Sequence, residues 1–316
     1  MSETYESALL DFCRTDERIV VMTAENRAPI RGLPAALGPR FIDVGICEQT
    51  MIGMAAGLAL RGRIPVVHAL ATFLTMRAFE FIRTDVGIAG LPVKLIGAVP
   101  GFLSEANGPT HQALEDIAIL RTIPGMRIVC PADAAEMVDA LPAILNEPGP
   151  VYVRYNARPA DRLRAPFRIG EAEVLSTGRD VALLVSGLLL EETLQAAEIL
   201  EEQGYDVMLV NLRSLAPVDT GVILRCASLT RFLVTVEDHF RTGGLRSIVA
   251  EVLLGARQAL PVLSLSMEDR WFRPALLHDV LSHEGFTGPQ IAGRIRKALR
   301  ASGIQPGEKR WQTASL

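Results

Sequence analysis

An acidic residue stands where an expected strand meets a helix rich in small residues, in the stretch 41–60 (FIDVGICEQTMIGMAAGLAL). At the first turn of that helix, the carboxylate of Glu48 either caps the helix and complements its dipole or serves as a buried acid–base group. The spacing alone leaves both interpretations open. The small residues from Gly53 to Gly57 let another backbone approach closely, which favours a tight helix contact such as one across a dimer axis.

Apolar side chains recur every three residues in the stretch 71–83 (ATFLTMRAFEFIR). If this stretch is helical, Phe73, Met76 and Phe79 lie on roughly one face. That face is either part of the hydrophobic core or a platform for a flat heteroaromatic ring. The pattern is compatible with both.

A histidine follows strong turn-forming residues in the stretch 101–116 (GFLSEANGPTHQALED). The Gly108-Pro109 pair predicts a turn that presents His111 just before a helix. An imidazole titrates near neutrality and can donate, accept or shuttle a proton. The sequence therefore leaves open whether His111 transfers protons or has a purely structural role.

An arginine ends the expected buried strand 151–154 (VYVR). Ligands of parallel sheets collect at the carboxyl ends of the strands, so Arg154 is well placed for an anionic substrate group. An ion pair within the protein is the alternative.

Two α/β units must position these groups. In the first, short β-branched runs alternate with helical stretches, which predicts a parallel sheet covered on both faces. We expect strands at 18–23, 64–68, 93–98, 126–130 and 151–154, and helices at 50–60, 77–88, 114–119 and 134–146.

A stretch rich in Arg, Pro and Asp separates this unit from the second one. We expect strands there at 180–185, 206–211 and 231–236, and helices at 189–203, 245–254 and 289–300. The predicted architecture is α/β, with two three-layer domains. A parallel sheet forms the first domain (1–157), a linker follows (158–169), and a mostly parallel sheet forms the second (170–303), before a polar tail (304–316).

Composition and missing motifs disfavour several functional classes. A net charge of −4 gives no global electrostatic case for binding nucleic acid or an acidic membrane. The chain starts without a secretion-signal pattern and its apolar runs are too short to span a bilayer, so we expect a soluble, cytoplasmic protein. The four cysteines form no CxxC pair, and GxGxxG, GxxxxGK[ST], HExxH and GxSxG are absent.

Taken in order, these segments resemble the transketolase family over about residues 18–300. VGICEQ resembles the family's catalytic glutamate segment, ATFLTMRAFEFIR its aromatic helix, and GPTHQALEDIAILRTIPGM the loop after its GEDG element. PADAAE follows in the expected order, and DVALLVSG, VNLRSLAPVD and VTVEDHFRTGGL resemble its C-terminal domain. The resemblance implies a pyrimidine-binding domain followed by that C-terminal domain.

The resemblance also implies a thiamine-diphosphate-dependent enzyme that transfers a two-carbon ketol unit from a ketose-type donor to an aldehyde-type acceptor. Glu48 matches the carboxylate that hydrogen-bonds N1′ of the aminopyrimidine. Phe73 and Phe79, with Met76 between them, match the ring-stacking positions. His111 matches a histidine that handles substrate hydroxyl protons, and Arg154 an arginine that binds a sugar phosphate.

A partner is implied as well. In the family, the diphosphate and Mg²⁺ are bound by a first domain with a GDG segment, which this sequence lacks. We therefore expect a split enzyme in which a second chain carries the diphosphate and Mg²⁺ site, with two copies of each chain (α2β2). Because this chain starts at its own Met, we expect it to be a complete subunit.

The departures from the family pattern cluster where substrate binds. Val99 stands at the position of a phosphate-binding histidine, and the GEDG element reads Glu105-Ala106-Asn107-Gly108. Asn107 thus replaces an aspartate that reads a sugar hydroxyl, and Glu25 lies in the segment that replaces Ala-Asp-Leu. We expect the substrate-binding set Glu25, Asn107, His111 and Arg154 to accept a non-standard substrate.

Three alternatives remain. The β subunit of a 2-oxo-acid dehydrogenase shares both domains and the glutamate, but usually has a His-rich stretch where this chain has only His111. A relative of deoxyxylulose-phosphate synthase is also possible, although those enzymes are normally one long chain. A non-catalytic regulatory paralogue is the third, and the argument against it is the presence of Glu48, Phe73, Phe79 and His111.

Overall fold

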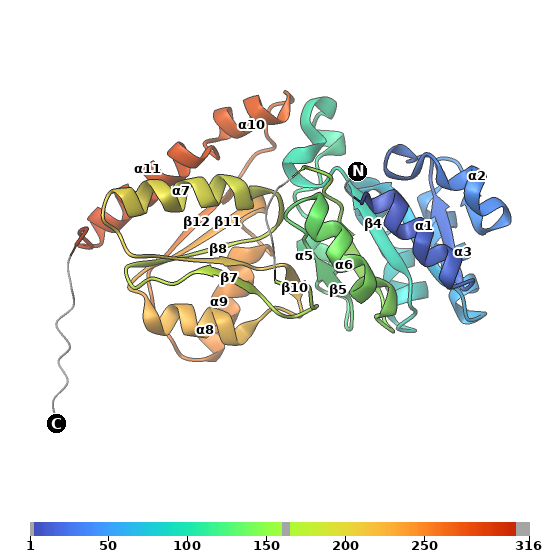
Figure 1. The fold of residues 1–316 in the computed structure, drawn as a ribbon, viewed down its shortest axis with the longest axis horizontal. Coiled ribbons are helices and arrows are strands. Elements are labelled where there is room, and N and C mark those ends of the chain that lie inside the picture. The colour runs from blue at the N-terminus through green and yellow to red at the C-terminus, as the bar shows by residue number, and fades with distance from the viewer. Residues whose placement is uncertain (1–2, 160–164, 308–316) are drawn as a thin grey trace.

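Buried runs of β-branched residues form the two sheets around which the protein is built (Figure 1). The computed structural model describes residues 3–159 and 165–307. Positions 1–2, 160–164 and 308–316, which include parts of the expected linker and tail, lie outside the described residues.

The first sheet has seven strands in the order β10-β5-β6-β4-β3-β1-β2. The strands are β1 (Ile19–Thr23), β2 (Phe41–Asp43), β3 (Ile64–Leu70), β4 (Lys94–Ala98), β5 (Arg127–Val129), β6 (Val151–Arg154) and β10 (Ser214–Ala216). The pairings of β1 to β6 are parallel, as expected. The edge strand β10 comes from the second half of the chain and pairs antiparallel with β5, so the purely parallel sheet expected here gains an antiparallel edge.

Helices cover both faces of this sheet. On one face lie α1 (Tyr5–Thr15), α2 (Leu33–Leu37) and α6 (Ala134–Asn146). On the other lie α3 (Glu48–Leu60), α4 (Phe79–Phe81) and α5 (Asp116–Leu120). Because all four residues of β6 are buried, both faces of the sheet are packed, as a parallel sheet requires.

The second sheet has the order β12-β11-β8-β9-β7 and is parallel except for the β7–β9 pair. The strands are β7 (Glu173–Ser176), β8 (Val181–Val185), β9 (Val207–Asn211), β11 (Leu233–Phe240) and β12 (Val262–Met267). Figure 1 shows this sheet between one layer with α7 (Leu190–Glu202) and α11 (Gly288–Ala301) and another with α8 (Thr220–Leu229) and α9 (Leu245–Gly255). Helix α10 (Leu277–Glu284) lies towards the first unit.

The helix expected at 77–88 has a different form. Two π-helical turns, Phe73–Arg77 and Ile82–Gly87, flank the short helix α4. A π-helical turn holds more residues than an α-turn, so side chains three apart no longer align along one face, and such turns are frequent at functional sites. The three-residue repeat of Phe73, Met76 and Phe79 is therefore broken in the structure.

Two buried histidines tie elements together. In β3, the Nδ1 of His68 donates to the carbonyl of Met22 (3.2 Å), so its Nε2 accepts from the hydroxyl of Tyr5 in α1 (2.8 Å). Burial lowers the pKa of His68 to about 4. Burial likewise lowers the pKa of His239, in β11, to about 4.

These two histidines predict acid sensitivity. Their folded pKa lies below the ordinary 6.5, so the unfolded chain binds more protons between pH 6.5 and about 4. The stabilisation that comes from keeping these histidines neutral is fully present above pH 6.5. As the pH falls through that window, each histidine lowers the unfolding free energy by about 1.4 kcal/mol per pH unit. The unfolding free energy from urea titrations, plotted against pH over this range, should have a smaller slope for His68→Gln than for wild type. The exposed His278→Gln serves as the control, and an unchanged slope in both variants would contradict this assignment.

Candidate active site

Glu48 lies at the carboxyl edge of the first sheet, at the start of α3. The loop that leads to it leaves β2, and Val44 N donates to the carbonyl of Thr23 at the end of β1 (3.0 Å). The side chain of Glu48 is 2% exposed, and its Oε2 accepts from Nη1 of Arg77 (2.9 Å). A buried carboxylate therefore faces the π-helical segment across a charge-assisted hydrogen bond.

A chain of contacts joins three segments that are separate in the sequence. The guanidinium carbon of Arg77 lies over the Phe73 ring, 4.3 Å from its centroid. The same ring meets the imidazole of His111 edge to face, with centroids 5.0 Å apart. The structure thus brings together Glu48, Phe73 and His111. Arg77, which sequence reasoning missed, connects Glu48 to Phe73.

Met76 and Phe79 have different surroundings from Phe73. Both are half-buried. Phe79 packs against the core that α3 forms, and Met76 Sδ accepts from the hydroxyl of Thr72 (3.7 Å). Of the three side chains expected to form a ring platform, only Phe73 takes part in the contact chain with Arg77 and His111 described above.

His111 is carried by an irregular loop of 3-10 turns, Gly101–Asn107 and Pro109–His111. Its imidazole is half-buried, and its Nδ1 lies 2.9 Å from the hydroxyl of Thr110. Asn107 is exposed, and its side-chain amide donates to the carbonyl of Ser104 (2.9 Å).

Backbone strain marks the edge around this site. Four non-glycine residues among those described have positive φ, and three of them lie here: Glu25 (60°), Val99 (49°) and Glu105 (45°). A β-branched residue such as Val99 is rarely found in that region, and strain of this kind persists where surrounding contacts fix the backbone. The strained positions coincide with the segments in which the sequence departs from the family pattern.

Asp43, a second residue that sequence reasoning missed, organises the loops after β1 and β2. Its carboxylate accepts from the backbone N–H groups of Glu25 (3.3 Å) and Gly45 (3.0 Å) and pairs with Arg27 (2.5 Å). Burial alone would raise the pKa of Asp43, but these donors lower it overall. The signal available in the sequence was an acidic residue at the end of a strand, two residues before a glycine.

Arg154 is held inside the protein. Its side chain is 4% exposed, Nε donates to Asp116 (3.0 Å) and Nη1 donates to Asp238 (2.6 Å). Nη2 donates to the carbonyls of Ala113 (3.4 Å) and Asp238 (3.2 Å). Since these acceptors occupy each of its guanidinium nitrogens, the structure corresponds to the ion-pair interpretation, and we do not retain the substrate-binding role expected for Arg154.

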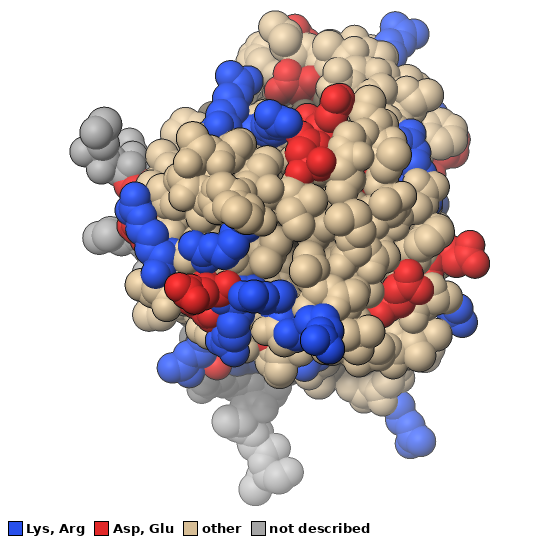
Figure 2. Space-filling view, turned by 90° about the vertical axis from the view of Figure 1, so that its right-hand side faces the viewer, with Lys and Arg blue, Asp and Glu red and all other residues tan. Residues whose placement is uncertain are grey.

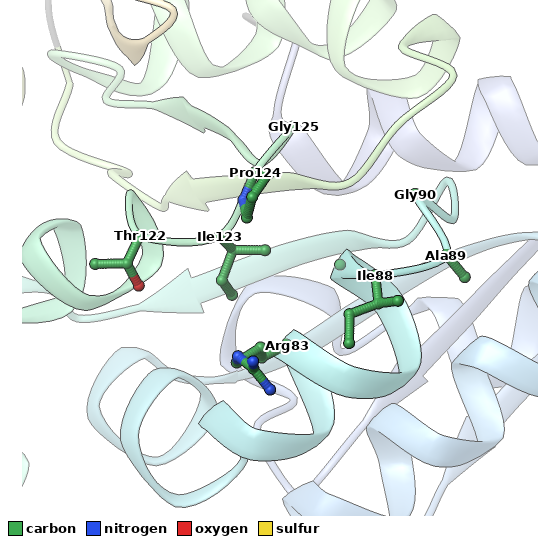
Figure 3. A pocket seen from close by; sticks show the side chains of 9 residues that line it. Arg83, Ile88, Ala89, Gly90, Thr122, Ile123, Pro124 and Gly125 are labelled. Carbon is green, nitrogen blue, oxygen red and sulfur yellow. The ribbon is translucent and has the colours of Figure 1, made fainter.

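A hollow of about 610 Å³ lies on the other side of the first domain (Figure 3). Figure 3 shows the side chains of Arg83, Ile88 and Ile123 around it. Its lining segments 87–90 and 122–125 precede β4 and β5, so it opens at the amino-terminal edge of the sheet. Ligands of open α/β sheets bind at the carboxyl edge, which is where Glu48 and His111 lie.

An apolar surface runs along α3 and the helical segment after Phe73. Ile46, Leu60 and Ile88 are 66%, 70% and 73% exposed, and Met54 and Phe81 are also exposed. Figure 2, which looks at the end of the molecule where α2 and α3 lie in Figure 1, shows a broad area with few charged side chains. Large exposed apolar areas of this kind mark interaction surfaces. Separately, no helix among the described residues is long and apolar enough to cross a membrane.

Comparison with known proteins identifies both domains of the chain. Residues 1–159 match the family model for the transketolase pyrimidine binding domain, and residues 170–291 match the transketolase C-terminal domain. The chain is 37% identical over 296 residues to a 6-deoxy-6-sulfo-D-fructose transketolase subunit of Clostridium sp. (strain MSTE9), covering 92% of each chain.

Two further similarities bear on the assembly. The chain is 39% identical to a 1-deoxy-D-xylulose-5-phosphate synthase of Synechococcus sp. (strain JA-2-3B'a(2-13)), but covers only 47% of that protein. Its fold matches a split-gene transketolase solved as an inactive β4 tetramer, with a TM-score of 0.84, 33% identity, and 94% and 97% of the two chains covered. Both the domain order and the extent of these matches show that the chain belongs to the transketolase family.

Proposed function

We propose that this chain is the subunit of a split, thiamine-diphosphate-dependent transketolase that contributes the pyrimidine-binding and C-terminal domains. The reaction is transfer of a two-carbon ketol unit from a ketose-type donor to an aldehyde-type acceptor. The observation that supports it most directly is the meeting of buried Glu48, the Phe73 ring and His111 at the carboxyl edge of one sheet. These are an acid–base group, an aromatic face and a proton-transfer group on one surface.

The residues present fit the aminopyrimidine of the cofactor. This ring needs a hydrogen bond to Glu48 and the face of Phe73. The Arg77 guanidinium, which is also planar and has N–H donors, makes both contacts, because it donates to Glu48 and lies over Phe73. When bound, thiamine diphosphate supplies the electron sink for the reaction. Glu48 would exchange a proton with the ring nitrogen, and Phe73, Met76 and Phe79 would position the ring.

A second subunit would complete the site. The sequence lacks the GDG segment with which the family binds the diphosphate and Mg²⁺. We place the diphosphate and Mg²⁺ on an N-terminal-type partner subunit, in an α2β2 assembly. The apolar surface along α3, with Ile46 and Leu60, is the face that this assembly would bury. The inactive β4 form of the structural relative is consistent with a requirement for that partner.

The substrate is proposed to be non-standard. Val99 offers no charge where the family pattern has a phosphate-binding histidine, and Asn107 replaces a carboxylate, so the loop is less acidic and presents an amide donor. The Clostridium relative is named for a sulfonated sugar. We propose a modified ketose donor, read by Glu25, Asn107 and His111. A deoxyxylulose-phosphate-synthase-like reaction is the second candidate, because of the 39% identity to such an enzyme.

Purification from native lysate tests the assembly. The complex should contain a second chain with a GDG segment, and thiamine diphosphate and Mg²⁺ should bind to the pair and not to this chain alone. The complex should transfer a ketol unit without releasing carbon dioxide from added pyruvate. Release of carbon dioxide from pyruvate would instead support the synthase-like reaction, and a chain that binds no partner or cofactor would contradict both.

Substitution of Glu48 tests the acid–base role. Glu48→Gln keeps the shape and the hydrogen-bonding capacity of the side chain but cannot exchange the proton. We expect turnover by the complex to fall by about 10²–10⁴, the usual contribution of a general acid–base group, with cofactor binding retained. Glu80→Gln, an exposed acid on the same helical segment as Arg77, is the control. Turnover within a factor of two of wild type in Glu48→Gln would refute this role.

Substitution of Arg77 tests whether its guanidinium competes with the cofactor ring. The ring needs the carboxylate of Glu48 and the face of Phe73, so Arg77 must first leave them. A half-exposed ion pair and a cation–π contact together contribute about 0.7–2 kcal/mol. Arg77→Leu should therefore bind thiamine diphosphate about threefold to thirtyfold more tightly in calorimetric titration of the complex. Arg77→Lys keeps the charge but not the planar stack. Its affinity for thiamine diphosphate should lie between those of wild type and Arg77→Leu. Weaker binding by Arg77→Leu would show that Arg77 supports the cofactor instead.

A further inference from the structure

A buried ionic cluster joins the two domains behind the loop that carries His111. Arg154 comes from β6 of the first domain and Asp238 from β11 of the second, and Asp116 of α5 completes the group. The side chains of Arg154, Asp116 and Asp238 are 4%, 0% and 2% exposed. The hydroxyl of Tyr152 also donates to Asp116 (2.6 Å). This cluster is remote from solvent and is shared between domains, so it is a structural junction between them.

Asp238 extends this junction to the loop 101–112. Its Oδ1 accepts from Arg154, and its Oδ2 accepts from the backbone N–H of Phe102 (3.3 Å). Gly101 has φ +55° and lies so close to the Asp238 carboxylate that no side chain would fit there. One carboxylate therefore holds the domain junction with one oxygen and the start of the loop with the other.

The rest of the loop is also attached to the C-terminal domain. The side chain of Gln112, which is 1% exposed, donates to the carbonyl of Phe272 (2.9 Å). The Phe102 ring packs edge to face on Phe272 and Phe286, with centroids 5.3 and 5.0 Å away. Both ends of the loop are thus held by the second domain, while Asn107, between them, remains exposed.

The backbone of this region needs such support. Val99 and Glu105 have positive φ, a conformation that persists only where neighbouring contacts fix it. The anchors at Phe102 and Gln112 bracket Glu105 and come from the C-terminal domain. The first domain alone does not supply these contacts.

We propose that Asp238 is a positioning residue for substrate recognition, which fixes the loop 101–112 so that Asn107 and His111 face the substrate. The C-terminal domain thereby sets substrate affinity through the loop, whereas the proposed cofactor-binding residues Glu48 and Phe73 belong to elements of the first domain. This assignment rests on the proposed function of that site. Arg154 acts from behind the loop, by holding Asp238 in place.

The test compares two isosteric substitutions in the assembled enzyme. Asp238→Asn replaces one of two acceptor oxygens by a donor. Asp180→Asn does the same to a buried aspartate just before β8, which accepts from Asp206 N (2.9 Å) away from the loop. For Asp238→Asn we expect the KM for the ketose donor to rise at least about tenfold, with kcat changed less. Affinity for thiamine diphosphate should stay within about twofold, and Asp180→Asn should behave as wild type.

Hydrogen exchange gives a readout that does not depend on turnover. The amide of Phe102 and its neighbours up to Gln112 should exchange faster in Asp238→Asn, while amides of α7 should be unchanged. If the complex binds cofactor but transfers no ketol unit, the proposed function fails, and the exchange data still decide the positioning role.

Two results would overturn the inference. One is unchanged loop exchange and unchanged KM in Asp238→Asn. The other is an equal loss of cofactor affinity, kcat and stability, which would make Asp238 a general stability residue. If Asp238→Asn does not fold, Gln112→Met removes the second anchor without touching the cluster. That variant should raise KM and loop exchange in the same way, and the absence of both effects would equally reject the inference.

Discussion

The placement of Arg154 between Asp116 and Asp238 is the constraint on which most of the structure depends. A buried ion pair gains little net free energy over an apolar replacement, but loss of one partner leaves a charge in a low-dielectric interior and costs about 3–5 kcal/mol. The cluster therefore specifies an arrangement more than it adds stability. It requires β6, α5 and β11 to meet, which fixes the second domain against the first and, through Asp238, fixes the loop beside the site.

The site has a corresponding electrostatic demand. Glu48 is placed at the helix start, where the dipole favours a carboxylate, yet it is almost fully buried and needs a donor. Arg77 supplies that donor from a π-helical turn, which also presents Phe73 to His111. The π-helical turns in residues 73–87 are therefore not a random distortion of an amphipathic helix. They provide the geometry that lets one segment serve a carboxylate, a ring face and a histidine.

Prediction from sequence succeeded where burial dominates. Strand β6 and helix α6 occur at the expected bounds, because a continuous apolar run and a capped amphipathic stretch have few alternatives. It missed the edge strands β7 and β12, in which exposed or half-buried residues and polar residues interrupt any continuous buried apolar run. It also missed the π-helical turns Phe73–Arg77 and Ile82–Gly87, which a three-residue repeat of apolar side chains does not predict.

The amino-acid sequence by itself determined the α/β class and the order of the two units, and it supplied Glu48, Phe73 and His111 as candidate site residues. It determined these because local periodicity and short motifs act over a few residues. Tertiary structure decided the partners: whether Arg154 meets a substrate or Asp238, which is 84 positions away, depends on how two domains dock. Nothing local encodes that contact, because both interpretations use the same buried strand end, and only the position of β11 distinguishes them.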